Sequence, residues 1–328
     1  MADEAQATAK GERSPRGQAS PVGETAHIEP APQNEEEDDP TLGEETLSST
    51  ASISSTILEF QTLHGRRYHA RFGDIKYWAA NDERQLESEE LQHLAMTLAL
   101  KGEFYLAPID RSKIEKALDI GTGGGLWAVD FADDNPNVEV IGTDISPVQP
   151  QWVPPNLRFE IEDFTKEWTF APESVDYIHL RWLLGSVADW DAFFKEAART
   201  LKSGGIVESH EPQCHIESED GSVKEDSALA KWGPMFVKAG ESWGRPFDII
   251  DKGSDWRLAQ ECGVEGIGRH SGEAFKRDLE GYALVAAAEG MGWDKEHTQV
   301  YAASLRKELA DRNIHPVFRH RIVWGRKP

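Results

Sequence analysis

Short apolar runs alternate with amphipathic stretches through the middle of the chain. These segments are four to six residues long and predict strands at 116–120, 137–142, 157–161, 175–180 and 206–209. In the third of them, 157–161, apolar and polar residues alternate. A helix is expected at 126–132, between the first two strands. A second helix is expected from the cap residue Asp189 to the glycine pair at 204–205, because an apolar stripe follows the cap: Trp190, Phe193, Phe194, Ala197 and Leu201. This alternation predicts a parallel sheet with helices on both faces.

The segments on either side of this region predict mainly helices. Residues 88–100 predict a helix with Ser88 as its cap, on an apolar stripe of Leu91, Leu94, Ala95 and Leu98. Residues 212–260 predict helical pieces that Gly233 and Pro234 interrupt, and 280–313 predict further helix with Asp294 as a cap. The chain closes on an extended run at 316–324.

Composition separates the N-terminal segment from the rest. Residues 1–50 hold 12 acidic and three basic residues and contain no Phe, Tyr or Trp, whereas all 11 tryptophans lie at Trp78 or beyond. Such a segment buries too little apolar area to offset its chain entropy, so we expect residues 1–52 to be a disordered acidic tail and 53–328 to fold. An acidic interaction tail is the alternative interpretation.

Charge and composition exclude several classes of protein. The formal net charge is −23, which argues against binding of nucleic acid or anionic membranes, since both need a basic face. No window approaches the roughly 18–20 apolar residues of a membrane span, and the N-terminus has no apolar signal core. Two cysteines form neither a disulfide framework nor a Cys-based zinc site. We expect an intracellular protein, cytoplasmic or nuclear, without a metal site.

One glycine-rich segment carries the candidate chemistry. Residues 119–125, Asp-Ile-Gly-Thr-Gly-Gly-Gly, follow a predicted strand and open a predicted helix, as a nucleotide-binding turn requires. Gly121 and Gly123 let the backbone turn tightly and approach a ligand. A dinucleotide fingerprint would place a third glycine at position 126, where this chain has Leu126, and no Gly-Lys-Ser/Thr follows. A NAD-linked oxidoreductase is therefore disfavoured, and a Walker loop is excluded.

The acidic residues near this turn favour a cationic ligand. Asp119 would repel a pyrophosphate, whereas S-adenosylmethionine carries a sulfonium and an ammonium group. Asp144 ends the second strand, where a carboxylate accepts hydrogen bonds from ribose hydroxyls. Asp163 ends the third strand and is placed to accept from an adenine amine, with Phe164 or Ile145 packing on the ring.

At this point the sequence resembles the class I S-adenosylmethionine-dependent methyltransferases over residues 115–211. Over nearly all of 56–328 it resembles the fungal methyltransferases of the LaeA type, a group that includes velvet-associated regulators of secondary metabolism. The matching segments are Gly65–His69, Asn81–Glu83, Leu91–His93, Ile141–Pro147 with Pro150, Val153–Asn156, Asp176–Arg181, Asp189–Trp190, Leu201 with Gly204–Gly205, and Gly325–Pro328. Two positions depart from the family: Ala80 replaces a proline and Ser88 replaces a basic residue.

The resemblance implies a doubly wound, seven-stranded α/β sheet of the Rossmann-like class I type. The last strand, at 317–323 within a segment 316–325, would be antiparallel and inserted in the sheet. A helical cap would occupy 56–110, the core 114–211, and helical insertions about 212–260 and 273–313. The residues implied to contact cofactor are Asp119, Gly121, Gly123, Gly125, Asp144, Ile145, Asp163 and Phe164.

Methyl transfer from a sulfonium depends mainly on alignment and water exclusion, and a base matters only for some acceptors. Candidate bases at strand ends are His179, His210 and Glu211, for which a purely structural role is the alternative. Candidate substrate-contacting residues are Tyr68, Tyr77, Trp78, Trp232 and Phe236, of which the first three belong to a possible lid and the last two to an apolar wall or simply a core.

Two functions follow from these observations. The first is an enzyme that uses S-adenosylmethionine to methylate a small organic acceptor, in fungal secondary metabolism. The second is a regulatory methyltransferase-fold protein of the LaeA type that acts through protein partners such as velvet-type proteins. Both hypotheses use the same cofactor residues, so the sequence does not separate them.

Overall fold

A seven-stranded sheet organises the chain. The computed structural model describes residues 60–69, 77–249, 262–263 and 268–328. The predicted disordered tail, 1–52, lies outside these residues. The sheet consists of β3 (Lys116–Ile120), β4 (Glu139–Asp144), β5 (Leu157–Ile161), β6 (Val175–Arg181), β7 (Leu201–Pro212), β8 (Cys262–Gly263) and β9 (His320–Arg326). Their order is β5-β4-β3-β6-β7-β9-β8.

The predicted topology is confirmed. Strands β5, β4, β3, β6 and β7 are parallel, and β9 pairs antiparallel with both β7 and β8. The last strand is therefore inserted in the sheet as expected, although it begins at His320 rather than at position 317. Strand β7 begins at Leu201, five residues before the predicted start, and so includes the glycine pair that was expected to precede it.

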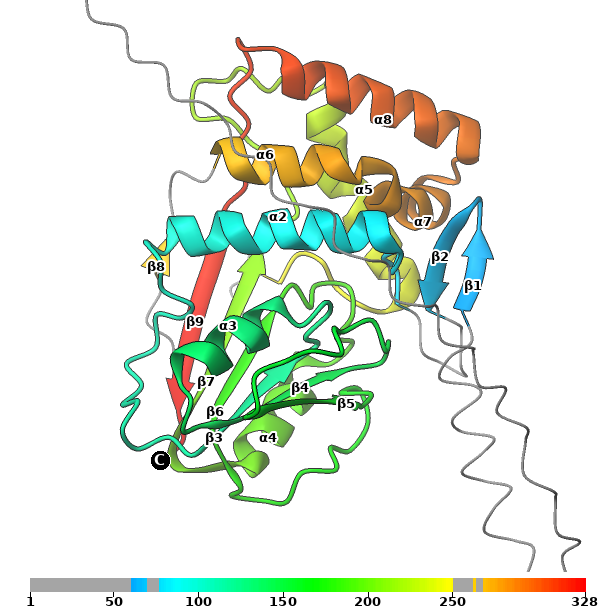
Figure 1. Cartoon of the computed structure of the whole chain (residues 1–328). Helices are drawn as coiled ribbons and strands as arrows, with labels where there is room; N and C mark the ends of the chain where they lie inside the picture. The colour runs from blue at the N-terminus through cyan, green and yellow to red at the C-terminus, as the bar shows by residue number, and fades with distance from the viewer. Residues whose placement is uncertain (1–59, 70–76, 250–261, 264–267) are drawn as a thin grey trace, which may run out of the picture. The chain divides into compact units, whose positions relative to one another are not determined.

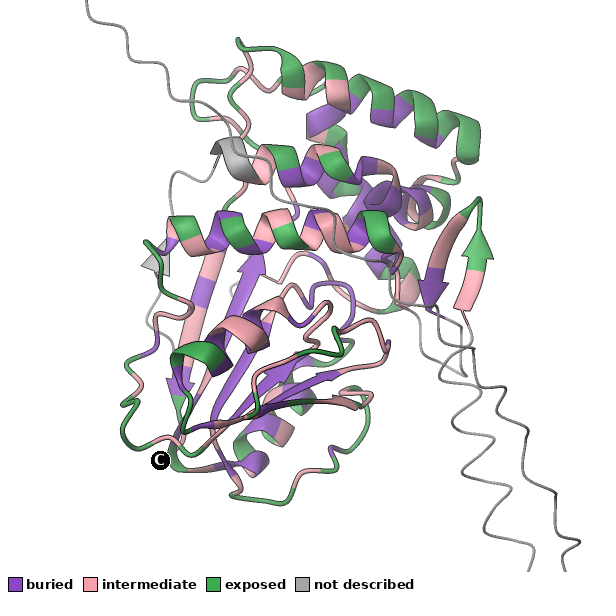
Figure 2. Ribbon diagram, viewed as in Figure 1, coloured by how far each residue is buried: buried purple, intermediate pink, exposed green. Residues whose placement is uncertain are grey.

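Helices cover both faces of the sheet, as the sequence pattern predicts (Figure 1). Helix α3 (Leu126–Asp134) packs through Trp127 and Phe131 on the face that carries Ala117 and Tyr177. Helix α4 (Trp190–Thr200), capped by Asp189, packs on the opposite face. Central strands buried on both sides consist of nearly continuous apolar runs, which is why the sequence pattern located them (Figure 2).

A second group of helices lies over the ends at which the parallel strands finish (Figure 1). Its members are α2 (Glu83–Ala99), α5 (Ala228–Trp243), α6 (Gly268–Arg277), α7 (Leu279–Met291) and α8 (Lys295–Ala310). Helix α5 was wrongly expected to break at Gly233 and Pro234. It continues because its apolar face is buried, and because the absence of a side chain at position 233 admits His215, whose Nδ1 would lie 2.3 Å from a Cβ there.

The N-terminal cap differs most from expectation. A hairpin of β1 (Phe60–Leu63) and β2 (Arg66–His69) precedes α2, so the cap is not purely helical. Helix α2 begins at Glu83, where Asp82 accepts from the Gln85 N–H, whereas Ser88 lies inside the helix and donates to the carbonyl of Ala274. Leu94 and Leu98 of the predicted apolar stripe are exposed. The face of α2 that turns inward is mostly polar, with Gln85, Ser88 and His93 buried beside Ala95 and Met96.

Candidate functional site

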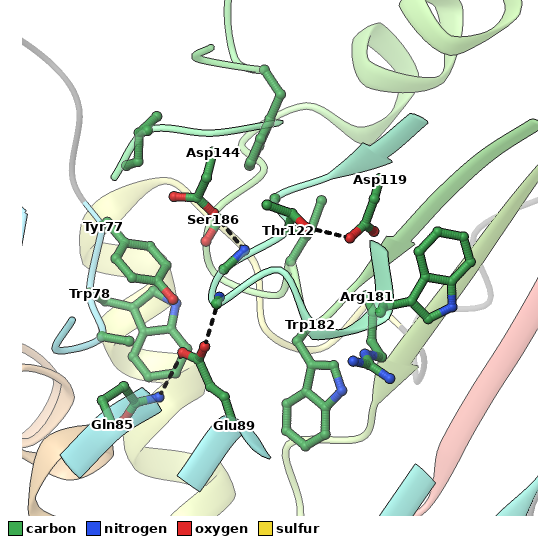
Figure 3. A pocket seen from close by; sticks show the side chains of 18 of the residues that line it. Tyr77, Trp78, Gln85, Glu89, Asp119, Thr122, Asp144, Arg181, Trp182 and Ser186 are labelled. Atoms are coloured by element: carbon green, nitrogen blue, oxygen red, sulfur yellow. Dashed lines mark hydrogen bonds between the residues drawn. The ribbon is translucent and has the colours of Figure 1, made fainter. Parts of the chain in front are cut away.

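The principal cavity lies at the carboxyl ends of the parallel strands, beneath α2. Its volume is about 140 Å³. Seven of the eight residues predicted to bind cofactor line it: Asp119, Gly121, Gly123, Asp144, Ile145, Asp163 and Phe164. They come from the ends of β3, β4 and β5, so the register of the parallel sheet brings them together (Figure 3).

The glycine turn after β3 approaches the opposite wall of this cavity closely. Gly121 has φ +68°, and a Cβ atom at this position would lie 2.5 Å from Leu183 Cδ2. Asp119 holds the turn from below, because its Oδ2 accepts a 2.6 Å hydrogen bond from the Thr122 hydroxyl. Burial raises the pKa of Asp119 to about 6. The result is a turn with open backbone above an acidic, water-poor floor.

Gly125 does not line the cavity, which corrects one expectation. It has φ +83° and stands at the N-cap of α3, where a Cβ atom would lie 2.4 Å from Phe159 Cζ. This third glycine of the motif therefore allows α3 to pack closely on β5. The contacts that the structure shows for Gly125 are packing contacts beneath the turn.

Two further carboxylates face the cavity from neighbouring strand ends. Asp144 accepts 2.9 Å hydrogen bonds from the backbone N–H groups of Gly123 and Ser146, and burial raises its pKa to about 6. Asp163 accepts from the backbone and hydroxyl of Thr165 through Oδ1. Its Oδ2 is buried and has no hydrogen-bond partner among the described residues. A buried acceptor without a partner is unfavourable unless a ligand donor satisfies it.

These features fit S-adenosylmethionine. The glycine turn offers a surface that any side chain would obstruct, and the unpartnered Asp163 oxygen suits a donor such as an exocyclic amine. Several carboxylates in one cavity match the positive charge of a sulfonium and an ammonium group.

Of the three candidate bases, only His179 lines the cavity. Its ring stacks on Trp127 with centroids 3.8 Å apart, and its Nδ1 lies 2.7 Å from Asp119 Oδ1. Its Nε2 has no partner among the described residues. Burial, together with nearby His210 and Arg181, lowers the pKa of His179 well below its usual value, so the ring is neutral at physiological pH.

His210 and Glu211 lie outside the cavity lining, contrary to expectation. His210 Nε2 is 2.7 Å from Glu208 Oε1. The Glu211 carboxylate accepts from the backbone N–H groups of Leu183 and Leu184 at 3.1 and 3.2 Å, and burial raises its pKa to about 8. Glu211 points to the side of the strand opposite to that of His210, since alternate residues of a strand point to opposite sides. Its carboxyl group binds the backbone of the loop at Leu183, which lines the cavity, so Glu211 supports this loop.

The predicted substrate-contacting aromatics separate into three groups. Tyr77 and Trp78 line the principal cavity, whereas Tyr68 is buried in β2 and does not. Trp232 and Phe236 belong to the core between α5 and α7. They also line a second, largely apolar cavity of about 100 Å³ together with Trp78. For these two residues both alternatives, core and wall, describe the structure.

The sequence reasoning missed a polar group contributed by α2 and the end of β6. Gln85, Glu89 and Gln92 project from α2 into the cavity, and Arg181 and Trp182 face it from β6 and the residue after it. The sequence did contain a signal, because these polar residues of α2 recur at helical spacing. The leucine stripe was instead taken as the inward face of the helix. Trp182 has φ +66°, a conformation that is uncommon outside glycine, directly at the cavity wall.

Among the described residues, no group of three or more His, Cys, Asp or Glu side chains is arranged to hold a metal ion. None of the helices described here has both the length and the apolar character that crossing a bilayer demands.

Comparison with known proteins agrees with this geometry. Residues 92–285 match the methyltransferase domain family. The methyltransferase pytC of Aspergillus terreus is 31% identical over 313 residues, which cover 89% of this chain and 94% of that relative. The secondary metabolism regulator LAE1 of Cochliobolus heterostrophus is 29% identical, covering 81% and 94%. The protein-methionine methyltransferase laeA of Emericella nidulans is 27% identical, covering 91% and 83%. The chain therefore belongs to the methyltransferase domain family, as an S-adenosylmethionine-dependent methyltransferase related to the LaeA type.

Proposed function

We propose that this methyltransferase transfers a methyl group to a small organic acceptor that binds in the second, apolar cavity. The principal cavity beside it would hold the cofactor and is called the cofactor pocket from here on. The observation that supports this proposal is the shared wall of the two cavities. Trp78, Gln92, Trp182 and Tyr282 line both. The remaining walls of the second cavity include Leu184, Trp232, Phe236, Phe247, Phe275 and Phe318. A concave site with aromatic walls and few polar groups is typical of small-molecule binding.

The cofactor-binding roles follow from the strand ends. Asp144 would hold the ribose hydroxyls, and Asp163 would accept from the adenine amine, with Ile145 and Phe164 beside the ring. When bound, S-adenosylmethionine supplies a methyl group on a positively charged sulfur. The contribution of the chain is to align the acceptor with that methyl group and to exclude water, which the aromatic walls and the cover of α2 favour.

The second candidate is a LaeA-type regulator that acts through protein partners, with velvet-type proteins as the first to test. Two of the relatives carry the names of a secondary metabolism regulator and a protein-methionine methyltransferase, and one of them is matched over 91% of this chain. Either candidate belongs to fungal secondary metabolism. A biosynthetic enzyme would act in the cytoplasm, whereas the regulator would act in or near the nucleus.

Methyl-labelled S-adenosylmethionine separates the two candidates. Purified protein is incubated with extract of the source organism, and the label is separated into low-mass and protein fractions, with Asp144→Ala as the inactive control. We expect label in a low-mass organic product. Label in a protein band, absent with Asp144→Ala, would overturn the small-molecule proposal and identify the target of a regulator.

A variant that fills the acceptor cavity sharpens this test. Ser271 lines the apolar cavity and not the cofactor pocket, so Ser271→Phe should abolish the low-mass product and leave cofactor affinity unchanged. Glu273→Phe, at an exposed position of the same helix, is the matched control and should retain activity. Equal product from both variants would show that the acceptor binds elsewhere.

A further inference from the structure

An acidic and a basic side chain lie in the cofactor pocket without forming an ion pair with each other. Glu89 projects from α2 and Arg181 ends β6, and both line the pocket (Figure 3). Each stabilises the charge of the other at a distance, yet among the described residues neither forms an ion pair. Desolvated charges are normally paired, so a pocket that keeps a carboxylate and a guanidinium apart is suited to a ligand that carries both charges.

Glu89 is positioned against the glycine turn. Its Oε2 lies 3.4 Å from the backbone N of Gly124, and its Oε1 accepts a 3.3 Å hydrogen bond from the Gln85 side chain. The same Oε2 would lie 3.0 Å from a Cβ atom at position 123. The carboxylate is therefore in contact with the surface that the glycines leave open for the cofactor.

Asp119, the other carboxylate at this turn, is already engaged. Its two oxygens are held by Thr122 and His179, and only 3% of the residue is exposed. Within the described part of the chain, Glu89 makes one side-chain hydrogen bond and one long backbone contact, which leaves lone pairs for a cationic donor. The direct partner of a ligand ammonium is therefore better sought at Glu89 than at Asp119.

Arg181 is held in place by a histidine. Its Nη2 lies 3.1 Å from His93 Nδ1, and His93 Nε2 lies 2.8 Å from Asp130 Oδ2. Because arginine only donates, Nδ1 of His93 accepts and Nε2 donates to Asp130. This arrangement orients the guanidinium, and among the described residues no carboxylate forms an ion pair with it, although Asp119, Glu89 and Asp130 stabilise its charge from a distance.

We propose that Glu89 and Arg181 form a two-point site for the amino-acid end of S-adenosylmethionine, with Glu89 binding the ammonium group and Arg181 the carboxylate. Their separation in one pocket selects a zwitterion over a ligand with one charge or none. The α2 residue Glu89 thereby makes this helix part of the cofactor site and not only a cover over it.

Three thioether ligands test this assignment by direct calorimetric titration at pH 8, where Glu89, whose pKa burial raises to about 7, is mostly ionised. S-adenosylhomocysteine carries both charges, its decarboxylated analogue carries only the ammonium group, and methylthioadenosine carries neither. We expect the wild-type protein to bind them in that order, each step weakening affinity about ten- to a hundredfold. Equal affinity for S-adenosylhomocysteine and methylthioadenosine would overturn the proposal without any variant.

The variants then assign each charge. Glu89→Gln should weaken binding of the two ammonium ligands at least about tenfold and leave methylthioadenosine unchanged. Arg181→Gln should weaken S-adenosylhomocysteine alone, and Glu90→Gln, exposed on the same helix, should change nothing. Retained binding of methylthioadenosine shows that the pocket is folded. A Glu89→Gln protein that binds all three ligands normally, or all three equally poorly, would contradict the role of Glu89.

Discussion

Asp82 and Asp278, the N-cap residues of α2 and α7, are both bound by the guanidinium of Arg66. Arg66 Nε and Nη2 donate to Asp82 at 2.6 and 2.7 Å, and Nη1 and Nη2 donate to Asp278 at 2.7 and 2.6 Å. The Asp278 side chain is fully buried. One residue of the β1–β2 hairpin thus fixes the starts of two helices that supply Glu89 and Tyr282 to the cofactor pocket.

Arg66→Gln should destabilise the fold by about 3 kcal/mol, because removing one partner of a buried ion pair leaves a desolvated charge behind. Arg84→Gln is the matched control: Arg84 reaches Asp278 and Glu280 from a side chain that is 43% exposed, so its loss should change stability by under about 1 kcal/mol. Urea unfolding measures both variants. Equal destabilisation by the two substitutions would show that Arg66 has no special role.

Gly125→Ala should lower stability more than Gly65→Ala. Both positions have φ +83°, so an alanine would adopt an unfavourable positive φ at either one. Only at position 125 would the new Cβ meet a neighbour, the ring of Phe159 at 2.4 Å, whereas nothing lies within 4 Å at position 65. Overpacking at the first site should add about 1–3 kcal/mol to the difference in unfolding free energy. Similar unfolding midpoints would mean that α3 shifts freely on β5.

The sheet was predictable because each of its parallel strands is one contiguous apolar segment of the sequence. The run Lys116–Ile120 is buried at four of five positions, and each parallel strand needs such a run. The acids Asp144 and Asp163 were found for a related reason, since parallel strands end at one edge and bring their following residues together. The inserted position of β9, in contrast, was expected only through family resemblance.

The polar half of the site was not predictable by the same argument. A helix that covers a pocket buries polar side chains, so the rule that apolar positions face inward misplaced Leu94 and Leu98 and missed Glu89. Helix α5 passes through Gly233 and Pro234 because burial of Trp232 and Met235 outweighs local propensity. The true contacts of Glu211 depend on a loop that only the folded chain brings near.

The free energy of unfolding that Glu211 contributes should fall as pH rises. Its pKa is raised to about 8 in the folded chain, so the folded state binds a proton that the unfolded state releases near pH 4.5. Stability from this group is therefore fully present at low pH and is lost as pH rises towards 8. Glu89, with a pKa of about 7, acts in the same direction, so the comparison must be between the wild type and Glu211→Gln.

Unfolding free energies at pH 6.5 and pH 8 measure this contribution. The wild type should lose up to about 2 kcal/mol more than Glu211→Gln over this interval. The histidines with lowered pKa values, such as His320 at about 4, are neutral in the folded chain but bind protons near pH 6.5 in the unfolded chain. They therefore raise stability as pH rises, but they do so equally in both proteins and cancel in the comparison. Identical pH dependence of the two proteins would show that Glu211 remains ionised in the fold.

His179→Ala should weaken cofactor binding without removing a base. The ring is fully buried, stacks on Trp127 and contacts Asp119, so its loss leaves a cavity and frees one oxygen of the acid that holds the glycine turn. We expect a lower melting temperature, a cofactor dissociation constant raised about tenfold, and kcat at saturating cofactor reduced less than about tenfold.

Asp119→Asn removes the other side of the same contact and should reproduce this pattern, with the loss concentrated in KM for cofactor. General-base catalysis supplies about 10²–10⁴-fold in rate, so a base at His179 would give a different result. In that case kcat for His179→Ala would fall by at least about 100-fold with unchanged cofactor affinity, and Asp119→Asn would alter the pH profile of kcat. The unpartnered Nε2 of His179 would then be the proton acceptor, and the methyl acceptor would carry an acidic hydrogen.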